Sequence, residues 1–108
     1  MVKKVFISQP MNGESDDEII ALRDRIMSKM PALTGEDVEF REIPSFFQRD
    51  KMRGMNAVRM LGMAIELLSD ADVAVFAPGW QYARGCRIEN RIAKDYSIPV
   101  IELDESDI

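Results

Sequence analysis

The chain has 108 residues, 46% of them hydrophobic and 31% charged, which is the size and composition of one globular domain. Lys and Arg total 14 against 19 Asp and Glu, a net charge of −5, so the chain lacks the positive surplus with which proteins bind nucleic-acid polymers. It contains no histidine and a single cysteine, Cys86. This excludes Ser-His-Asp catalysis, histidine-ligated metal sites and an intrachain disulfide.

The lone cysteine is typical of a reducing cytosol. The first residues show no targeting pattern, and no apolar stretch reaches membrane-spanning length. We therefore expect a cytoplasmic protein with no membrane partner.

Residues 3–8 are rich in β-branched and aromatic residues and predict a buried strand. A loop at 9–13 follows. Ser15 and Glu18 then form a capping-box pattern, which predicts the start of a helix. Apolar residues recur at helical spacing up to Pro31, where we expect this helix to end.

Residues 38–43 alternate between polar and apolar and predict a strand at a sheet edge. A polar loop at 44–54 leads to a second helix at 56–69. This helix has two apolar stripes, one of Val58, Leu61, Ile65 and Leu68 and the other of Met60, Ala64 and Leu67.

The unbroken apolar run at 73–77 predicts a central strand that is buried on both faces. A third helix at 84–96 and a last strand at 98–103 complete the pattern, and residues 104–108 are expected to form a free tail. The order βαβαβαβ predicts one doubly wound, flavodoxin- or Rossmann-like α/β domain over residues 1–108. Its four-stranded parallel sheet would carry helices on both faces.

Ligands of such sheets bind beyond the carboxyl ends of the strands. No Gly-x-Gly-x-x-Gly or P-loop motif is present, so we expect no dinucleotide and no other cofactor. After the first strand, Ser8, Gln9, Asn12 and Gly13 offer donors for a sugar or an anion at a helix entry. Ordinary turn chemistry would also explain these residues.

Glu89 is the one carboxylate in the middle of the apolar stripe of the third helix. Burying an unpaired charge is costly, so this position indicates a functional carboxylate, or one that reaches water or pairs with an arginine. Gly85, one turn earlier, would let a ligand approach Glu89 or would tighten helix packing. Arg84, the first residue of this helix, joins the substrate-binding candidates. Cys86 is expected to be an inert buried thiol.

Trp80 precedes the third helix and could stack on a flat ligand or cap the edge of the core, as could Tyr82. Phe46, Phe47 and the second stripe of the second helix exceed what one small core needs. We read this surplus, together with the cluster of Met52, Met55, Met60 and Met63, as packing or a subunit interface in a homodimer or larger closed homo-oligomer.

Three segments carry a family resemblance: residues 6–13 (FISQPMNG), 71–76 (ADVAVF) and 83–89 (ARGCRIE). They resemble a family of small phage and bacterial domains, which in turn is similar to the nucleoside 2-deoxyribosyltransferase superfamily. That superfamily includes deoxynucleotide N-glycoside hydrolases. The resemblance implies that Glu89 of the Gly-x-x-x-Glu motif is the nucleophile. It also implies that the first loop holds the sugar or phosphate, and that subunits associate.

The chain also departs from the enzymes' pattern. Ala64 and Met63 stand where the enzymes carry an aspartate, and Met11 and Asn12 stand where hydrolases often place an arginine. Ala83 replaces an acidic or hydroxyl residue. Two hypotheses follow. One is cleavage or transfer at the N-glycosidic bond of a small-molecule nucleoside or nucleotide. The other is a module that binds such a ligand without catalysis.

Overall fold

The computed structural model of the chain describes residues 1–46 and 54–108. Its strands are β1 (Val2–Ser8), β2 (Glu39–Glu42), β3 (Val73–Phe76) and β4 (Val100–Glu102). They form one all-parallel sheet in the order β2-β1-β3-β4. Because the chain leaves β1 toward β2 and later returns to the other side of β1, the connections diverge at the carboxyl ends of β1 and β3.

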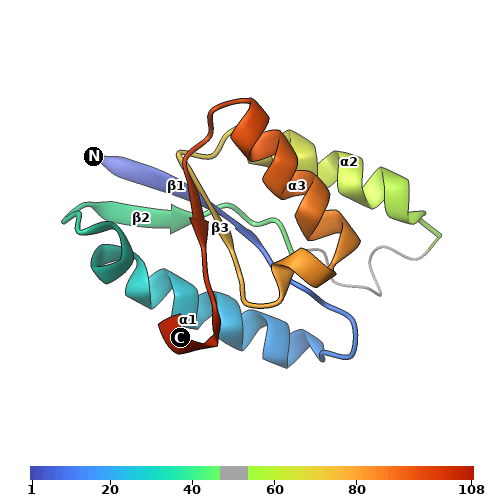
Figure 1. Cartoon of the computed structure of the whole chain (residues 1–108), viewed down its shortest axis with the longest axis horizontal. Helices are drawn as coiled ribbons and strands as arrows, with labels where there is room; N and C mark the ends of the chain where they lie inside the picture. The colour runs from blue at the N-terminus through green and yellow to red at the C-terminus, as the bar shows by residue number, and fades with distance from the viewer. Residues whose placement is uncertain (47–53) are drawn as a thin grey trace.

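Three helices cover the sheet: α1 (Asp16–Thr34) lies on one face, and α2 (Ala57–Leu68) and α3 (Arg84–Asp95) lie on the other (Figure 1). A short 3-10 helix, η2 (Trp80–Tyr82), leads into α3. The predicted doubly wound α/β fold is confirmed. Within the described part of the chain, no helix has the length and apolar character needed to cross a membrane.

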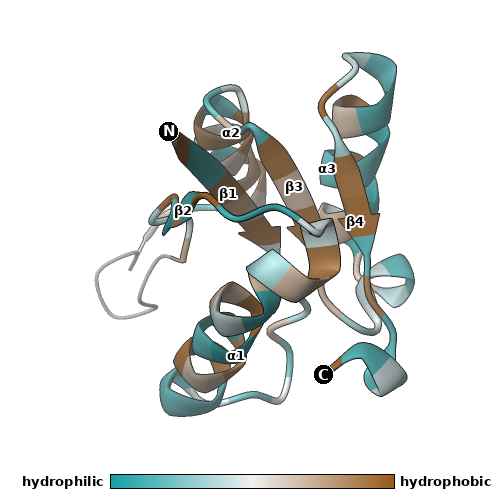
Figure 2. Ribbon diagram, turned by 90° about the vertical axis from the view of Figure 1, so that its left-hand side faces the viewer, coloured by the Kyte–Doolittle hydropathy of each residue, from teal (hydrophilic) through white to brown (hydrophobic). Residues whose placement is uncertain are grey.

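The sheet separates two apolar clusters, and β3, β4 and most of β1 are coloured brown, as hydrophobic, in Figure 2. On the α1 face the buried residues are Val5, Ile7, Ile26, Met30, Val73, Val75, Ala77 and Leu103. On the other face they are Phe6, Ile43, Ala64, Leu68, Ala74, Phe76 and Ala93. All of β3 is buried, whereas β2 alternates between exposed and half-buried at the sheet edge. Both strand positions predicted from the apolar patterns are thus confirmed.

The helix α1 begins as predicted but ends later. Ser15 and Glu18 form a complete capping box, in which the Glu18 amide donates to Ser15 Oγ at 3.1 Å. The expected end at Pro31 is wrong, because the helix continues to Thr34. Pro31 loses only its own amide bond, and its carbonyl still accepts from the Gly35 amide at 2.8 Å. The helix stops at Gly35, whose φ of 70° lies in the left-handed region.

The chain end is not a free tail. Residues Glu105–Asp107 form a 3-10 helix, η3, which is capped by the Asp104 side chain. Ile108 packs, partly buried, against the apolar cluster on the α1 face. Burying the apolar surface of Ile108 against the core stabilises this folded end, although most residues of the segment are polar.

The face of α2 that packs on the sheet combines residues of both predicted stripes. Ala64 and Leu68 are buried, and Leu67 packs against the core beside them. Val58, expected on the core stripe, is 80% exposed. Leu68 of the expected core stripe is buried as predicted, whereas the expectation that Ala64 and Leu67 belong to an outer surface is wrong. Phe47 and Met52 lie outside the described residues.

Candidate functional site

A cavity of about 860 Å³ opens at the carboxyl end of β1, between the loop that follows this strand, α2 and the start of α3. Six of the predicted site residues line it: Ser8, Gln9, Asn12, Arg84, Gly85 and Glu89. The two others, Gly13 and Trp80, are not part of its described wall. The topology thus brings residues 8–12 and 84–89 together at the divergence point of the sheet, as expected for this fold class.

Glu89 lies in the wall of the cavity and is only 8% exposed. Ser8, the last residue of β1, donates a hydrogen bond from Oγ to Glu89 Oε1 at 2.6 Å. No described residue donates to Oε2, and no buried side-chain oxygen among these residues lacks a hydrogen-bond partner. Oε2 therefore keeps some contact with solvent. Because Glu89 lines the cavity, this contact is on the cavity side.

Burial raises the pKa of the Glu89 carboxyl above its ordinary value of 4.5. The hydrogen bond from Ser8 and the positive charge of Arg23 act in the opposite direction, because both favour the carboxylate. Carboxyl groups whose pKa is shifted by burial and by specific partners are common at functional sites.

This raised pKa makes the stability of the fold depend on pH. Since Glu89 ionises less readily in the folded chain than in the unfolded one, its contribution to stability is complete below the unfolded pKa and is lost as the pH rises through the folded pKa. We expect Glu89→Gln to gain stability relative to the wild type as the pH rises from below the unfolded pKa through the raised folded pKa. Urea unfolding of both proteins across that range measures the difference. A constant difference would contradict the prediction.

Arg23 is a site residue that the sequence analysis missed. It projects from α1, is 4% exposed, and lines the same cavity. Its guanidinium donates to Glu42 Oε2 at 2.6 Å, to Ser45 Oγ at 2.6 Å and to Gln9 Oε1 at 3.1 Å. The signal was present in the sequence, because Arg23 lies one turn after Ile19 on the apolar stripe of α1, just as Glu89 interrupts the stripe of α3.

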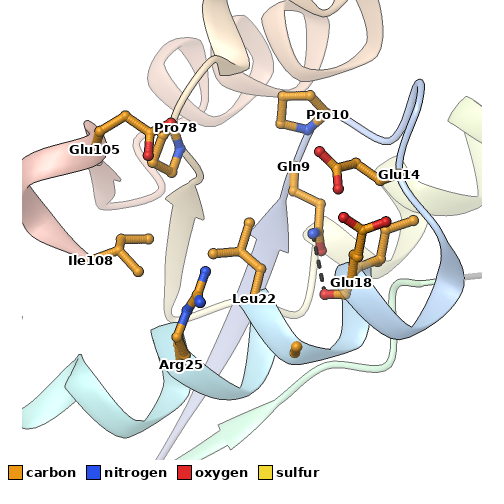
Figure 3. A pocket seen from close by; sticks show the side chains of 11 residues that line it. Gln9, Pro10, Glu14, Glu18, Leu22, Arg25, Pro78, Glu105 and Ile108 are labelled. Atoms are coloured by element: carbon orange, nitrogen blue, oxygen red, sulfur yellow. Dashed lines mark hydrogen bonds between the residues drawn. The ribbon is translucent and has the colours of Figure 1, made fainter.

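Gln9 is buried, and its polar atoms are bonded within the protein rather than free for a ligand. It accepts from Arg23 and donates from Nε2 to the Ile19 carbonyl at 3.3 Å. It also lines a second cavity of about 520 Å³ beside α1 and the chain end (Figure 3). There Glu14, Glu18, Arg25 and Glu105 surround an apolar floor that includes Leu22 and Ile108.

Gly85 and Cys86 form part of the α3 wall of the larger cavity. A Cβ added at Gly85 would lie 4.0 Å from Leu61 Cδ1, which is an ordinary contact. Helix packing therefore does not require a glycine here, whereas close approach of a ligand would benefit from one. Burial raises the pKa of the Cys86 thiol to about 11, which agrees with the expected inert thiol.

The two aromatic residues of η2 have different surroundings. Trp80 packs against Phe76 with the ring centroids 5.6 Å apart, and Lys94 Nζ lies 5.8 Å from the centre of the Trp80 ring. This is the core-capping arrangement. Tyr82 lines the cavity and is 84% exposed, so it is the aromatic ring available for stacking. Asn12 is exposed in the cavity wall, and Gly13 turns the first loop with a φ of 81°.

No protein-family model, curated protein or solved structure matches this chain. Residues 1–46 and 54–108 contain no group of three or more potential metal-ligating side chains. The proposal for the function therefore depends on the geometry of the cavity.

Proposed function

We propose that the chain cleaves or transfers at the N-glycosidic bond of a deoxyribonucleoside or its monophosphate, with Glu89 as the nucleophile. The supporting observation is the state of this carboxylate: Ser8 holds one oxygen at 2.6 Å, and no described residue donates to the other, in the wall of a cavity of about 860 Å³. The resemblance of the 83–89 segment to the Gly-x-x-x-Glu motif of the 2-deoxyribosyltransferase superfamily supports the same role.

In the proposed reaction, Glu89 Oε2 forms a bond to the anomeric carbon as the bond from that carbon to the base nitrogen breaks. The base leaves with the bonding electron pair and takes a proton from water. Water or a second base then attacks the anomeric carbon as its bond to Glu89 Oε2 breaks, which releases the carboxylate, and the attacking group gives its proton to the hydroxide left by the first step. Dividing one displacement into two steps is the general advantage of a carboxylate nucleophile.

The charges around the cavity suit an anionic ligand. Glu89 is the only carboxylate among its described lining residues, whereas Arg23 and Arg84 are both cationic. Arg84 is exposed at the first position of α3, whose amide end carries no side-chain cap. A phosphate there would meet a cation and the positive end of the helix dipole.

One observation favours a second candidate function, the binding of the same ligand without cleavage. Ala64 lines the cavity, so the position where the enzymes carry an aspartate presents a methyl group. The described wall then offers no second carboxyl that could protonate a leaving base. Incubation of the pure protein with each deoxynucleoside and its monophosphate, with detection of free base, tests the first function. A thermal-shift screen of the same compounds tests the second.

We further propose that a second copy of the chain covers the mouth of this cavity. Four large apolar residues that line it are exposed: Val58 (80%), Tyr82 (84%), Met11 (37%) and Ile88 (37%). Clustered exposed apolar residues of this kind mark association surfaces. We expect light scattering to give at least a dimer mass. Val58→Glu should lower that mass, and Ile20→Glu, at an exposed position of α1, should not. A monomeric wild type would refute the assembly.

A further inference from the structure

We infer that Arg23 is a positioning residue for Glu89: it fixes the end of β1 that carries Ser8, and Ser8 holds the carboxylate. No bond-making or bond-breaking step of the proposed reaction uses Arg23, and the resemblance does not assign it a role. Only the expected effect of Arg23 on the reaction rate rests on the proposed function. Its effect on the orientation and charge of Glu89 does not depend on that function.

The contacts of Arg23 flank Ser8 on both sides. One guanidinium nitrogen, Nη1, donates to the Ile7 carbonyl at 3.5 Å and to Gln9 Oε1 at 3.1 Å. These are the residues directly before and after Ser8. The other nitrogen, Nη2, donates to Ser45 Oγ at 2.6 Å, and Ser45 Oγ in turn donates to the Ile7 carbonyl at 3.2 Å. The strand end that bears Ser8 is thus held by a closed set of hydrogen bonds.

The burial of Arg23 shows that it is more than a surface partner of Glu42. An arginine that served only as a surface partner of Glu42 would keep its head in water, whereas Arg23 is 4% exposed and Glu42 is 28% exposed. Burying a guanidinium is unfavourable unless its N–H groups form hydrogen bonds, and all three nitrogens of Arg23 donate. They connect α1 to β1, to β2 and to the segment that follows β2.

The same charge faces Glu89 across the cavity wall. The titratable or charged side chains of the described wall are Arg23, Tyr82, Arg84, Cys86 and Glu89. Arg84 is exposed at the mouth, and Cys86, with a pKa raised to about 11, is neutral at neutral pH. Arg23 is therefore the buried cation of the described wall, and its charge favours the ionised, nucleophilic form of Glu89.

The test compares Arg23→Met, Arg23→Lys and a control variant, Arg25→Met, which removes an exposed arginine of the same helix. The readout is the side-chain carboxyl titration of Glu89, followed by carbon-13 NMR and assigned with Glu89→Gln. We expect Arg23→Met to move the titration midpoint of Glu89 to higher pH. Arg23→Lys should restore most of the difference, and Arg25→Met should leave the midpoint at the wild-type value. An unchanged midpoint in Arg23→Met would overturn the inference, as would an equal shift in Arg25→Met.

A further variant keeps the inference testable if Arg23→Met does not fold. Glu42→Gln leaves Arg23 in place and removes its counter-charge, so we expect the Glu89 midpoint to fall. A midpoint that does not fall would contradict the inference. Where the wild type releases base, Arg23→Met should lower the rate about 10- to 100-fold, because a displaced Ser8 misplaces the nucleophile. If the wild type releases none, the proposed function fails, and the titration still decides the role of Arg23.

Discussion

Replacing Glu89 with Gln is expected to lower the rate of base release by at least about 10³-fold, because the amide keeps the shape of the side chain but is not a competent nucleophile. Ser8 can still donate to the amide oxygen, so the fold around the cavity should persist. Binding of the deoxynucleoside monophosphate should be retained or become tighter, since the variant removes a negative charge from the cavity wall. Glu66→Gln, at an exposed position of α2 outside the cavity, is the matched control.

A covalent intermediate gives a second and independent measurement. If Glu89 attacks the anomeric carbon, rapid acid quenching during turnover should leave a deoxyribosyl ester on the peptide that contains Glu89. Mass spectrometry detects the added sugar. Base release by Glu89→Gln at the wild-type rate would exclude Glu89 as the nucleophile. Binding by the wild type without release of base would instead support the second candidate function.

The fold was predictable because each element has a strong local pattern. The unbroken apolar run of β3 can be satisfied only by burial on both faces, and the alternation of β2 only by an edge position. Once strands alternate with helices, parallel pairing and the crossover rule leave few topologies. The carboxyl ends of β1 and β3 are then the expected place for a site, and the cavity opens at the end of β1.

The errors in the predicted elements share one cause, which is that local pattern does not show what a residue packs against. Pro31 looks like a helix end, but a helix tolerates one lost amide bond in its last turn. Val58 fits the same apolar stripe of α2 as Leu68, but only Leu68 is buried, and Ala64 of the other stripe is buried beside it. Ile108 lies in an acidic segment, and only the folded chain shows the core that it covers.

The candidate site was predictable in part for a similar reason. Glu89 stands out because a carboxylate in an apolar stripe conflicts with simple packing, and the structure places it in the cavity wall. Arg23 carries the same conflict on α1 and can be found by the same test. Its four acceptors could not be found, because Ile7, Gln9, Glu42 and Ser45 approach it only after β1 and β2 pair.

Replacing Phe76 with Ala should lower the free energy of unfolding by about 3–5 kcal/mol, a typical cost for truncating a fully buried aromatic residue. Phe76 ends β3, is 0% exposed, and belongs to the cluster under α2 and α3. Small domains are stabilised by only about 5–15 kcal/mol in total. The variant should therefore unfold at a much lower urea concentration. Tyr96→Ala, which removes an aromatic ring that is 77% exposed, should change stability by less than about 0.5 kcal/mol.

The same substitution should also weaken the cavity, because Phe76 supports the route from β3 to α3. Its ring meets Trp80 at a centroid distance of 5.6 Å, and Trp80 begins the short helix that ends next to Arg84 and Gly85. Loss of this contact frees the segment that positions the first turn of α3 against the cavity.

We expect the midpoint of unfolding and the affinity for a deoxynucleoside monophosphate to fall together in Phe76→Ala. In Leu68→Ala, which also truncates a fully buried residue of this cluster, stability should fall and affinity should change little. Equal losses of affinity in the two variants would show that general destabilisation, and not the Phe76–Trp80 contact, controls the site.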